Sequence, residues 1–159
     1  MSELDEKFMR RAIELAQKGA DSNTGGPFGC VIARDGKVVG EGVNQVTSTN
    51  DPTAHAEVVA IRDACKSLDS FQLGGCIVYT SCEPCPMCLG AIYWARPERV
   101  FIACDRHDAA NAGFDDAFIY DELCGNNFDD RKVQISTLLR DEGLTVFHNW
   151  IAKPDKIEY

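Results

Sequence analysis

Two short stretches of the chain carry side chains that could together hold a metal ion. His55 and Glu57 lie two residues apart, and Cys85 and Cys88 lie three residues apart within the sequence Pro-Cys-Pro-Met-Cys. One imidazole and two thiolates supply three ligands of a tetrahedral zinc site, and the fourth corner stays open to water, as it does in catalytic zinc sites. The sequence therefore predicts one zinc ion bound by His55, Cys85 and Cys88.

Glu57 supplies the group that such a site needs for hydrolysis. A zinc ion lowers the pKa of a water molecule that it binds, so that hydroxide is present at neutral pH. A carboxylate next to that water can accept its proton and deliver it to a substrate. Because Glu57 lies so close to His55 in the sequence, we expect it to carry this proton in a hydrolase.

Three other interpretations of the cysteines stay open at this point. The Cys-x-x-Cys pair could be a thiol-disulfide redox pair at a helix start, although this leaves the His-x-Glu motif without a role. Cys82, Cys85 and Cys88 share the spacing of an iron-sulfur motif, but Ile92 occupies the position of its fourth cysteine. Cys82 could also complete a closed structural zinc site, and Glu57 would then have no function.

The metal ligands need elements that bring two distant stretches together, and the local sequence predicts two helix starts for this purpose. Asp51-Pro52 has the form of an N-cap followed by proline at the first helical position, which predicts a helix over 51–68 with the His-x-Glu motif in its first turn. Residues two apart on a helix point about 200° away from each other, so both can reach one metal only near the helix start. A second helix is predicted over 86–95, with Cys85 at its start.

Hydrophobic periodicity and turn residues predict the remaining elements, which alternate between strands and helices. Asp35-Gly36 is expected to join two antiparallel strands as a tight hairpin, and Gly19 is expected to end the first helix. The other predicted helices cover 5–18, 117–123 and 144–152, and the predicted strands cover 28–33, 37–42, 76–80, 100–103 and 133–137. This order predicts an α/β fold, a three-layer α/β/α sandwich around a mixed central sheet.

Length and composition predict a single domain over residues 1–159. The chain is 45% hydrophobic, which at this length suffices for a core without disulfide bonds, so the eight cysteines are expected to be reduced thiols in the cytoplasm. The sequence shows neither a secretory leader nor an apolar run of about 18 residues that would span a membrane. The net charge of −9 repels nucleic acid, so we expect a small-molecule substrate and neither a nucleic-acid nor a membrane partner.

The two metal motifs resemble those of the cytidine-deaminase-like zinc hydrolases, whose pattern is His-x-Glu followed by Pro-Cys-x-x-Cys. Further stretches are similar to the small guanine deaminases within that group. They are Gly-Gly-Pro-Phe-Gly at 25–29, Asn-Asp-Pro-Thr-Ala-His-Ala-Glu at 50–57, Ser-Cys-Glu-Pro-Cys-Pro-Met-Cys at 81–88, Ala-Ile-Tyr-Trp-Ala-Arg at 91–96, Gly-Phe-Asp-Asp at 113–116 and the final Tyr159. The resemblance thus covers the middle of the chain almost continuously.

The resemblance implies roles for several residues besides the zinc ligands and Glu57. Asn44 would bind the ring edge of the substrate through its amide, and Phe28 and Trp94 would be the walls on which a flat base stacks. Asp116 would accept hydrogen bonds from the N–H groups of a purine and take part in proton transfer. The implied reaction replaces the amine at C2 of guanine with hydroxide from zinc-activated water, which gives xanthine and ammonia.

Simpler interpretations of these side chains stay open as well. Asn44 could make only local backbone hydrogen bonds. Phe28 and Trp94 could be core residues, and Asp116 could cap the helix that follows it. The metal motif does not identify the base, so cytosine, guanosine or tRNA adenosine stays an alternative substrate.

The C-terminal residues add one further expectation. Tyr159 is an aromatic residue at the end of a charged tail, and the simplest expectation is a solvent-exposed end. The resemblance to guanine deaminases implies instead that this segment folds over the active site, where Tyr159 contacts the bound base. It also implies a homodimer, since some family members exchange these segments between their subunits.

Overall fold

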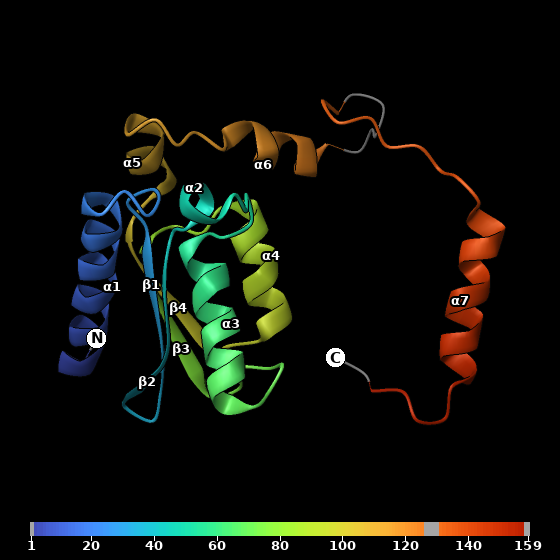
Figure 1. The fold of residues 1–159 in the computed structure, drawn as a ribbon, viewed down its shortest axis with the longest axis horizontal. Helices are drawn as coiled ribbons and strands as arrows, with labels where there is room; N and C mark the ends of the chain where they lie inside the picture. The colour runs from blue at the N-terminus through green and yellow to red at the C-terminus, as the bar shows by residue number, and fades with distance from the viewer. Residues whose placement is uncertain (1, 126–130, 158–159) are drawn as a thin grey trace. The chain divides into compact units, whose positions relative to one another are not determined.

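The computed structural model describes residues 2–125 and 131–157 of the chain (Figure 1). Its helices are α1 (Glu3–Asp21), α2 (Val46–Thr49), α3 (Ala56–Leu68), α4 (Pro86–Ala95), α5 (Arg106–Asn111), α6 (Ala117–Cys124) and α7 (Arg140–Ala152). Its strands are β1 (Gly29–Arg34), β2 (Lys37–Val43), β3 (Cys76–Cys82) and β4 (Arg99–Cys104). The chain divides into two compact units, Met1–Asp116 and Ala117–Tyr159, and each is described by itself.

The first unit is built on a mixed four-stranded sheet with the strand order β2-β1-β3-β4. Strand β1 pairs antiparallel with both β2 and β3, whereas β3 and β4 run parallel. Helix α1 covers one face of the sheet, and α3 and α4 lie on the other side (Figure 1). The predicted three-layer α/β/α sandwich is thus confirmed, with α4 as the crossover that a parallel strand pair requires.

The hairpin of β1 and β2 forms where the sequence predicts it. Asp35 and Gly36 both have a positive φ, of 50° and 73°, which is the backbone of a type I′ turn and matches the twist of the two strands. Arg34 lies opposite Lys37 beside this turn. The turn therefore lies at one end of the sheet, and Asn44, which follows β2, lies at the other.

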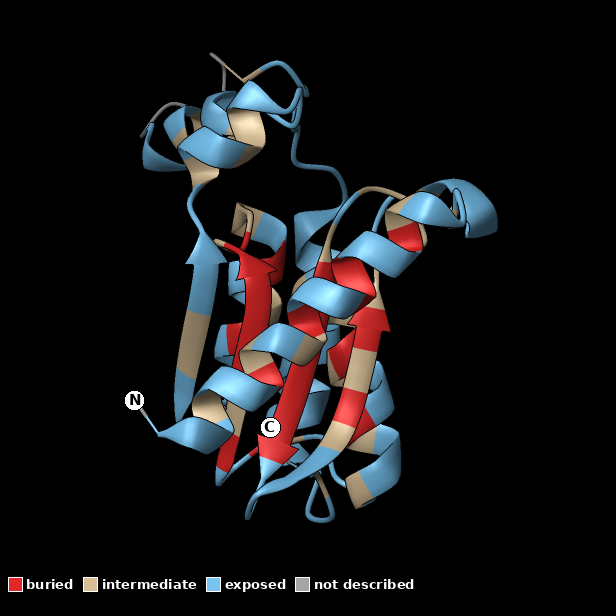
Figure 2. Cartoon of the chain, turned by 90° about the vertical axis from the view of Figure 1, so that its left-hand side faces the viewer, coloured by how far each residue is buried: buried red, intermediate tan, exposed pale blue. Residues whose placement is uncertain are grey.

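Successive side chains of the two central strands point to opposite faces of the sheet, so a core forms on each face. In β1, Val31 belongs to the cluster under α1, and the next residue, Ile32, belongs to the cluster under α3. In β3, Tyr79 packs against Phe8 of α1, whereas Val78 packs on the α3 side. Buried residues accordingly concentrate in β1 and β3, while the edge strand β4 is largely exposed (Figure 2). Burial on both faces explains why the central strands are almost continuous apolar runs.

Small residues allow α3 to lie very close to β2. A Cβ atom on Gly42 would be 2.1 Å from the carbonyl oxygen of Ala56, and one on Gly40 would be 2.6 Å from that of Ala60. Ala56, Ala60 and Ala64 on the facing side of the helix are fully buried. Because no side-chain atom fits at such distances, glycine at 40 and 42 is what permits this packing. The packing also fixes the first turn of α3, to which Ala56 belongs.

Helix α3 begins later than the sequence predicts, and the predicted cap is wrong. Oδ1 of Asp51 accepts hydrogen bonds from N and Oγ1 of Thr53, at 2.8 and 2.6 Å, and these bonds close a local turn in place of a helix start. The N-cap is His55, whose backbone is extended, with φ −70° and ψ 156°. Residues two apart inside a helix point in nearly opposite directions. Because His55 precedes the helix and Glu57 lies within it, this restriction does not apply to their side chains.

Helix α1 extends beyond its predicted end at Gly19, so that prediction is also wrong. Gly19 is buried inside the helix, where a Cβ atom would lie 3.4 Å from Cβ of Val43. The helix ends at Asp21, and Oγ of the C-cap residue Ser22 donates to the carbonyl oxygen of Lys18 at 2.8 Å. Gly19 therefore serves the close packing of α1 on β2 and not the termination of the helix.

The second unit contains α6 and α7, both near their predicted positions. The predicted strand at 133–137 is wrong, because no strand forms there and Val133 and Ile135 are 72% and 54% exposed. A strand needs a neighbour for its backbone hydrogen bonds, and the described residues of this unit contain none. Among the described helices of the whole chain, none combines the length and hydropathy needed to cross a lipid bilayer.

Candidate active site

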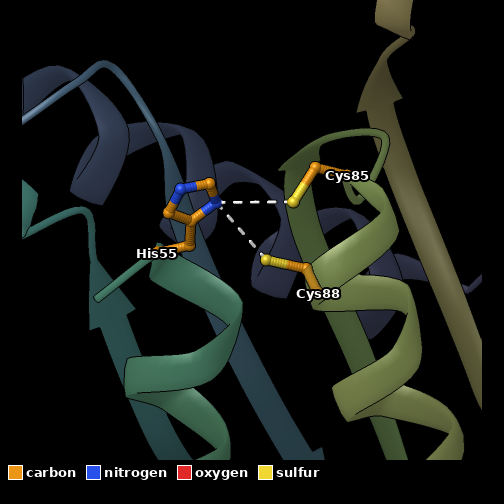
Figure 3. A group of neighbouring side chains, drawn as sticks. All are labelled: His55, Cys85 and Cys88. Atoms are coloured by element: carbon orange, nitrogen blue, oxygen red, sulfur yellow. Dashed lines mark hydrogen bonds between the residues drawn. The ribbon is translucent and has the colours of Figure 1, made fainter. Parts of the chain in front are cut away.

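The three predicted metal ligands come from the starts of two neighbouring helices (Figure 3). His55 is the N-cap of α3, and Cys85 is the N-cap of α4. Pro86 follows as the first residue of α4, where its missing N–H costs no helical hydrogen bond, and Cys88 is the third residue of that helix. Both cap residues have an extended backbone, so their side chains meet between the helix starts. The positive ends of two helix dipoles stabilise thiolates at this point.

The positions of the three side chains fit a tetrahedral zinc ion. Nδ1 of His55 lies 3.5 Å from Sγ of Cys85 and 3.5 Å from Sγ of Cys88 (Figure 3). All three ligand atoms lie within 4.8 Å of one another. Zinc bonds of about 2.3 Å to sulfur and about 2.0–2.1 Å to nitrogen place such atoms about 3.6 Å apart in a tetrahedron. The two nitrogen–sulfur distances therefore match the spacing of ligands around a tetrahedral zinc ion.

Cys82 does not belong to this group of ligands. Within the described part of the chain, the cluster consists of His55, Cys85 and Cys88. The Cys82 thiol instead donates to the carbonyl oxygen of Asp105 at 3.4 Å. This arrangement disfavours a closed zinc site and an iron-sulfur motif, since both would use Cys82. The imidazole beside the two thiols likewise disfavours a simple dithiol redox pair.

The two thiols differ in acidity because one donates a hydrogen bond to the other. The hydrogen bond from Cys88 lowers the pKa of Cys85 against the opposing effect of burial, and His55 adds to the lowering. The same hydrogen bond, together with burial, raises the pKa of Cys88. The hydrogen bond to Cys85 is also the main reason that the pKa of His55 is raised. Both thiols must lose their protons when a metal binds the two sulfurs as thiolates.

Glu57 reaches the same region from the first turn of α3. The residue is only 6% exposed and lines the cavity beside the ligands, and burial raises its pKa. Oγ1 of Thr80, in β3, donates to Oε1 of Glu57 at 3.1 Å and orients the carboxylate. A buried carboxyl group with a raised pKa is suited to accept and return protons near neutral pH.

A cavity of about 370 Å³ lies next to the metal ligands, and its walls belong to the first unit. Cavities of this size hold single small molecules in other proteins. The predicted site residues that line it are Phe28, Asn44, His55, Glu57, Cys85 and Asp116. Other side chains in its walls are Val46, Thr47, Cys82, Glu83, Arg106, Asp115 and Phe114.

Asn44 makes local backbone hydrogen bonds and also faces the cavity. Its Oδ1 accepts from the backbone N of Gly26 at 3.2 Å and from that of Val46 at 3.2 Å. A Cβ atom on Gly25 would lie 2.4 Å from this oxygen, so the glycine-rich segment wraps closely around the amide. These contacts fix the orientation of the amide and leave its NH₂ group as the donor toward a bound molecule.

Phe28 lines the cavity, whereas Trp94 does not. The ring of Phe28 meets that of Phe114 edge-on, with 4.9 Å between centroids, and both rings are part of the wall. Trp94 lies on α4, is 65% exposed and is not among the cavity residues of the described chain. Neither ring of the predicted pair is therefore a fully buried core residue. Tyr159 lies outside the described residues.

Asp116 lines the cavity at the end of the first unit. Partial burial raises its pKa, and the negative charge of Cys85 adds to this effect. The charge of Asp116 in turn contributes to the raised pKa of His55. Asp116 is therefore close enough to the ligands for their charges to interact.

Glu83 and Arg106 form an ion pair in the cavity wall to which the sequence assigned no role. Nε of Arg106 donates to Oε1 of Glu83 at 3.0 Å, and its backbone N donates to Oε2 at 3.0 Å. The partners are 23 residues apart and meet only because β3 and β4 pair in parallel, with Cys82 opposite Cys104. The only visible signal was an acidic residue directly before Pro-Cys, and nothing local pointed to its partner.

Comparison with known proteins places these features in context. The family described as the cytidine and deoxycytidylate deaminase zinc-binding region matches residues 2–104. The guanine deaminase of Bacillus subtilis is 54% identical over 154 residues, which are 97% of this chain and 98% of that protein. An X-ray structure of guanine deaminase from Bacillus subtilis has a TM-score of 0.94 at 53% identity, and the match covers 100% of this chain and 99% of that one. A tRNA-specific adenosine deaminase of Haemophilus influenzae is 44% identical over 106 residues, 65% of this chain and 61% of that protein.

Proposed function

The chain belongs to the cytidine and deoxycytidylate deaminase zinc-binding family, and from this premise we propose that the protein is a zinc-dependent guanine deaminase. The reaction is the hydrolysis of guanine to xanthine and ammonia. The observation that carries the proposal is the cavity next to the ligand cluster, which His55, Cys85, Glu57 and Asp116 line together. The match to a guanine deaminase over 97% of the chain supports the choice of base.

The proposed mechanism assigns the proton transfers to Glu57. His55, Cys85 and Cys88 would hold the zinc ion, which would supply the activation of a water molecule for attack on carbon. The water oxygen bonds to C2 of guanine while Glu57 accepts a proton from the water and delivers it to the ring nitrogen N3. Glu57 then takes the remaining hydroxyl proton to the exocyclic amine, the C2–N bond breaks, and ammonia leaves.

Recognition of the base is proposed for side chains that share the cavity. The NH₂ group of Asn44 donates to an acceptor on the purine edge, and Phe28 provides an apolar wall for the ring. Asp116 accepts hydrogen bonds from purine N–H groups. The 6-oxo group and N1–H would distinguish guanine from adenine, which has neither.

Adenosine in tRNA is a less favoured substrate for two reasons. The net charge of −9 disfavours approach to a phosphate backbone. The similarity to the tRNA-specific adenosine deaminase of Haemophilus influenzae covers 65% of this chain, whereas the similarity to the guanine deaminase covers 97%.

A cytoplasmic homodimer with exchanged C-terminal segments completes the proposal. In the described part of the second unit, Val146, Phe147 and Ile151 of α7 are each 67% exposed. Large apolar side chains that gather on one element commonly mark an interface, and in this proposal the exchanged segment carries Tyr159 to the base bound by the partner subunit. The eight cysteines are free thiols, which suits a reducing compartment.

An ammonia-release assay with guanine, guanosine, adenine, adenosine, cytosine and cytidine tests the proposed substrate. Guanine should have the highest kcat/KM of the six compounds. Faster turnover of cytosine or adenosine would leave the family assignment intact and refute the choice of base. Elemental analysis of the same protein should find one zinc ion per chain, and iron with sulfide would contradict the metal centre.

A further inference from the structure

The segment from Asp105 to Asp116 carries the proposed purine acceptor, Asp116, along one wall of the cavity. Arg106, Phe114 and Asp116 of this segment all line that wall. Its regular part is α5, which has only six residues, and a helix of this length has little stability of its own. The position of Asp116 therefore depends on contacts between the segment and the rest of the first unit.

The first of these contacts is the ion pair of Arg106 with Glu83. The Glu83 carboxylate accepts from the backbone N of Arg106 and from its guanidinium, the latter through both Nε and a terminal nitrogen. The two guanidinium nitrogens form a fork that converges on Oε1 of Glu83, while the backbone N of Arg106 donates to Oε2, so the arrangement defines direction as well as distance. Glu83 lies two residues before the ligand Cys85, and its own backbone N donates to the carbonyl oxygen of Cys104 at 2.9 Å. The loop that carries a metal ligand thus holds the first residue of α5.

The second contact is made by Phe114, close to Asp116 itself. Gly113 has a φ of +92°, which turns the chain so that the backbone N of Phe114 donates to the carbonyl oxygen of Ala109 at 3.0 Å. The ring of Phe114 then packs edge-on against Phe28. Phe114 is 44% exposed, so this packing covers only part of the ring. The ion pair is the more directional of the two contacts.

Charge connects Arg106 to Asp116 as well. Burial raises the pKa of Asp116, the charge of Cys85 adds to this effect, and the positive charge of Arg106 opposes both. The guanidinium of Arg106 is therefore within electrostatic reach of Asp116 while Glu83 holds it in place.

We propose that Arg106, held by Glu83, is a positioning residue that sets the place of Asp116 opposite the metal ligands. The proposal rests on the proposed function. It adds the Arg106–Glu83 ion pair, which acts on the bound base only through Asp116. The loop before Cys85 and the segment that ends at Asp116 then move together, so the position of the bound base relative to the metal is preserved.

A double-mutant cycle tests whether Arg106 acts through Asp116. Arg106→Gln should lower kcat/KM for guanine by about 10-fold, and Asp116→Asn should lower it further. If Arg106 serves to position Asp116, Arg106→Gln should have almost no additional effect in the Asp116→Asn background. Losses that multiply in the double variant would overturn the proposal, since Arg106 would then act independently, for example on the substrate itself.

Two further variants separate positioning from a general structural role. Arg106→Lys keeps the charge but loses the fork, so it should recover part of the lost kcat/KM. Arg11→Gln is the control, because Arg11 also binds a glutamate through Nε and a terminal nitrogen, with one bond to each oxygen of Glu41 at 2.8 and 2.9 Å, away from the cavity. Arg11 and Arg106 have side-chain exposures of 37% and 41%. Arg11→Gln should leave kcat/KM unchanged.

Zinc content and the thermal midpoint of each variant show whether it has folded. Should Arg106→Gln fail this test, the cycle is run with Arg106→Lys. A wild-type protein that releases no ammonia from guanine would overturn the proposed function and this inference together. A wild type that is active, with an Arg106→Gln variant as active as Arg11→Gln, would overturn the inference alone.

Discussion

At the scale of single residues, the metal centre depends on where each ligand lies in its helix. His55 and Cys85 are N-caps, so an extended backbone directs each side chain out of its helix toward the gap between the helix starts. Glu57 lies inside the first turn of α3 and would point away from a ligand two residues earlier in a regular helix. Because His55 is a cap, the ligand and the carboxylate serve one site.

Replacing single cysteines distinguishes the open three-ligand site from a closed one. Cys88→Ala should lose bound zinc and ammonia release, because two remaining ligands bind zinc weakly. Cys82→Ala should keep one zinc ion per chain, since its thiol bonds to Asp105 and lies outside the cluster. Elemental analysis and turnover of both variants check this. Full zinc in Cys88→Ala, or its loss from Cys82→Ala, would require a different ligand set.

Glu57→Gln should separate zinc binding from proton transfer. The amide has the same shape and keeps the zinc ligands in place, but it cannot accept a proton, so turnover should fall by about 10²–10⁴-fold or more. Thr80→Val removes the hydrogen bond that orients the carboxylate and should have a smaller effect. Steady-state rates on zinc-loaded protein provide the measurement. A rate within about threefold of wild type would remove Glu57 from the mechanism.

The sequence predicted these residues because their chemistry is encoded in local spacing. The ligands and Glu57 occupy two short motifs, so the type and distance of each residue could be seen directly. The Glu83–Arg106 pair depends on the register of two strands, and no local pattern encodes it. For the same reason, the sequence could not show that Trp94 lies outside the cavity.

At the scale of elements, periodicity located the helices, while competing contacts decided where they end. Asp51 is of a residue type that commonly caps helices, yet its carboxylate accepts hydrogen bonds from Thr53 and helix α3 starts later. Gly19 is of a residue type that commonly ends helices, yet it packs on Val43 and helix α1 continues past it. Each outcome depends on a partner that is invisible in a short window of sequence.

Helix α1 and strand β2 are linked by the Arg11–Glu41 pair, which predicts a pH-dependent stability. The hydrogen bond from Arg11 lowers the pKa of Glu41. A lowered carboxyl pKa stabilises the fold fully above the ordinary value of about 4.3, and the effect disappears as the pH falls through the lowered value. Both side chains are about one third exposed, at 37% and 33%, so the effect should be no more than about 1 kcal/mol.

Arg11→Gln should therefore lower the thermal midpoint by about 1–4 °C at pH 7. This difference from wild type should begin to shrink below the ordinary glutamate pKa of about 4.3 and should approach zero once the pH lies below the lowered pKa of Glu41, where the carboxyl group is protonated in both proteins. Arg10→Gln is the control, because Arg10 pairs with Glu6 on the surface, with exposures of 74% and 59%. A difference that grows as the pH falls would contradict the assignment.

At the scale of the whole molecule, the cavity belongs to the first unit, whereas the proposed closing segment belongs to the second. Deletion of residues 157–159 should leave the fold and the zinc content unchanged and should lower kcat/KM for guanine, because closure excludes water and completes the site. Circular dichroism, elemental analysis and steady-state rates of the truncated protein check each part. An unchanged kcat/KM would show that these residues take no part in closure.

The two ends of the central sheet differ in a way that has a practical use. Glu57 and the metal ligands lie at the end where α3 and α4 begin, and the Asp35-Gly36 turn lies at the other. A strand of six residues, such as β1, spans about 20 Å, so this turn is far from the chemistry. An affinity tag inserted there would immobilise the catalyst with its cavity facing solution, as an ammonia-detecting electrode for purine bases requires.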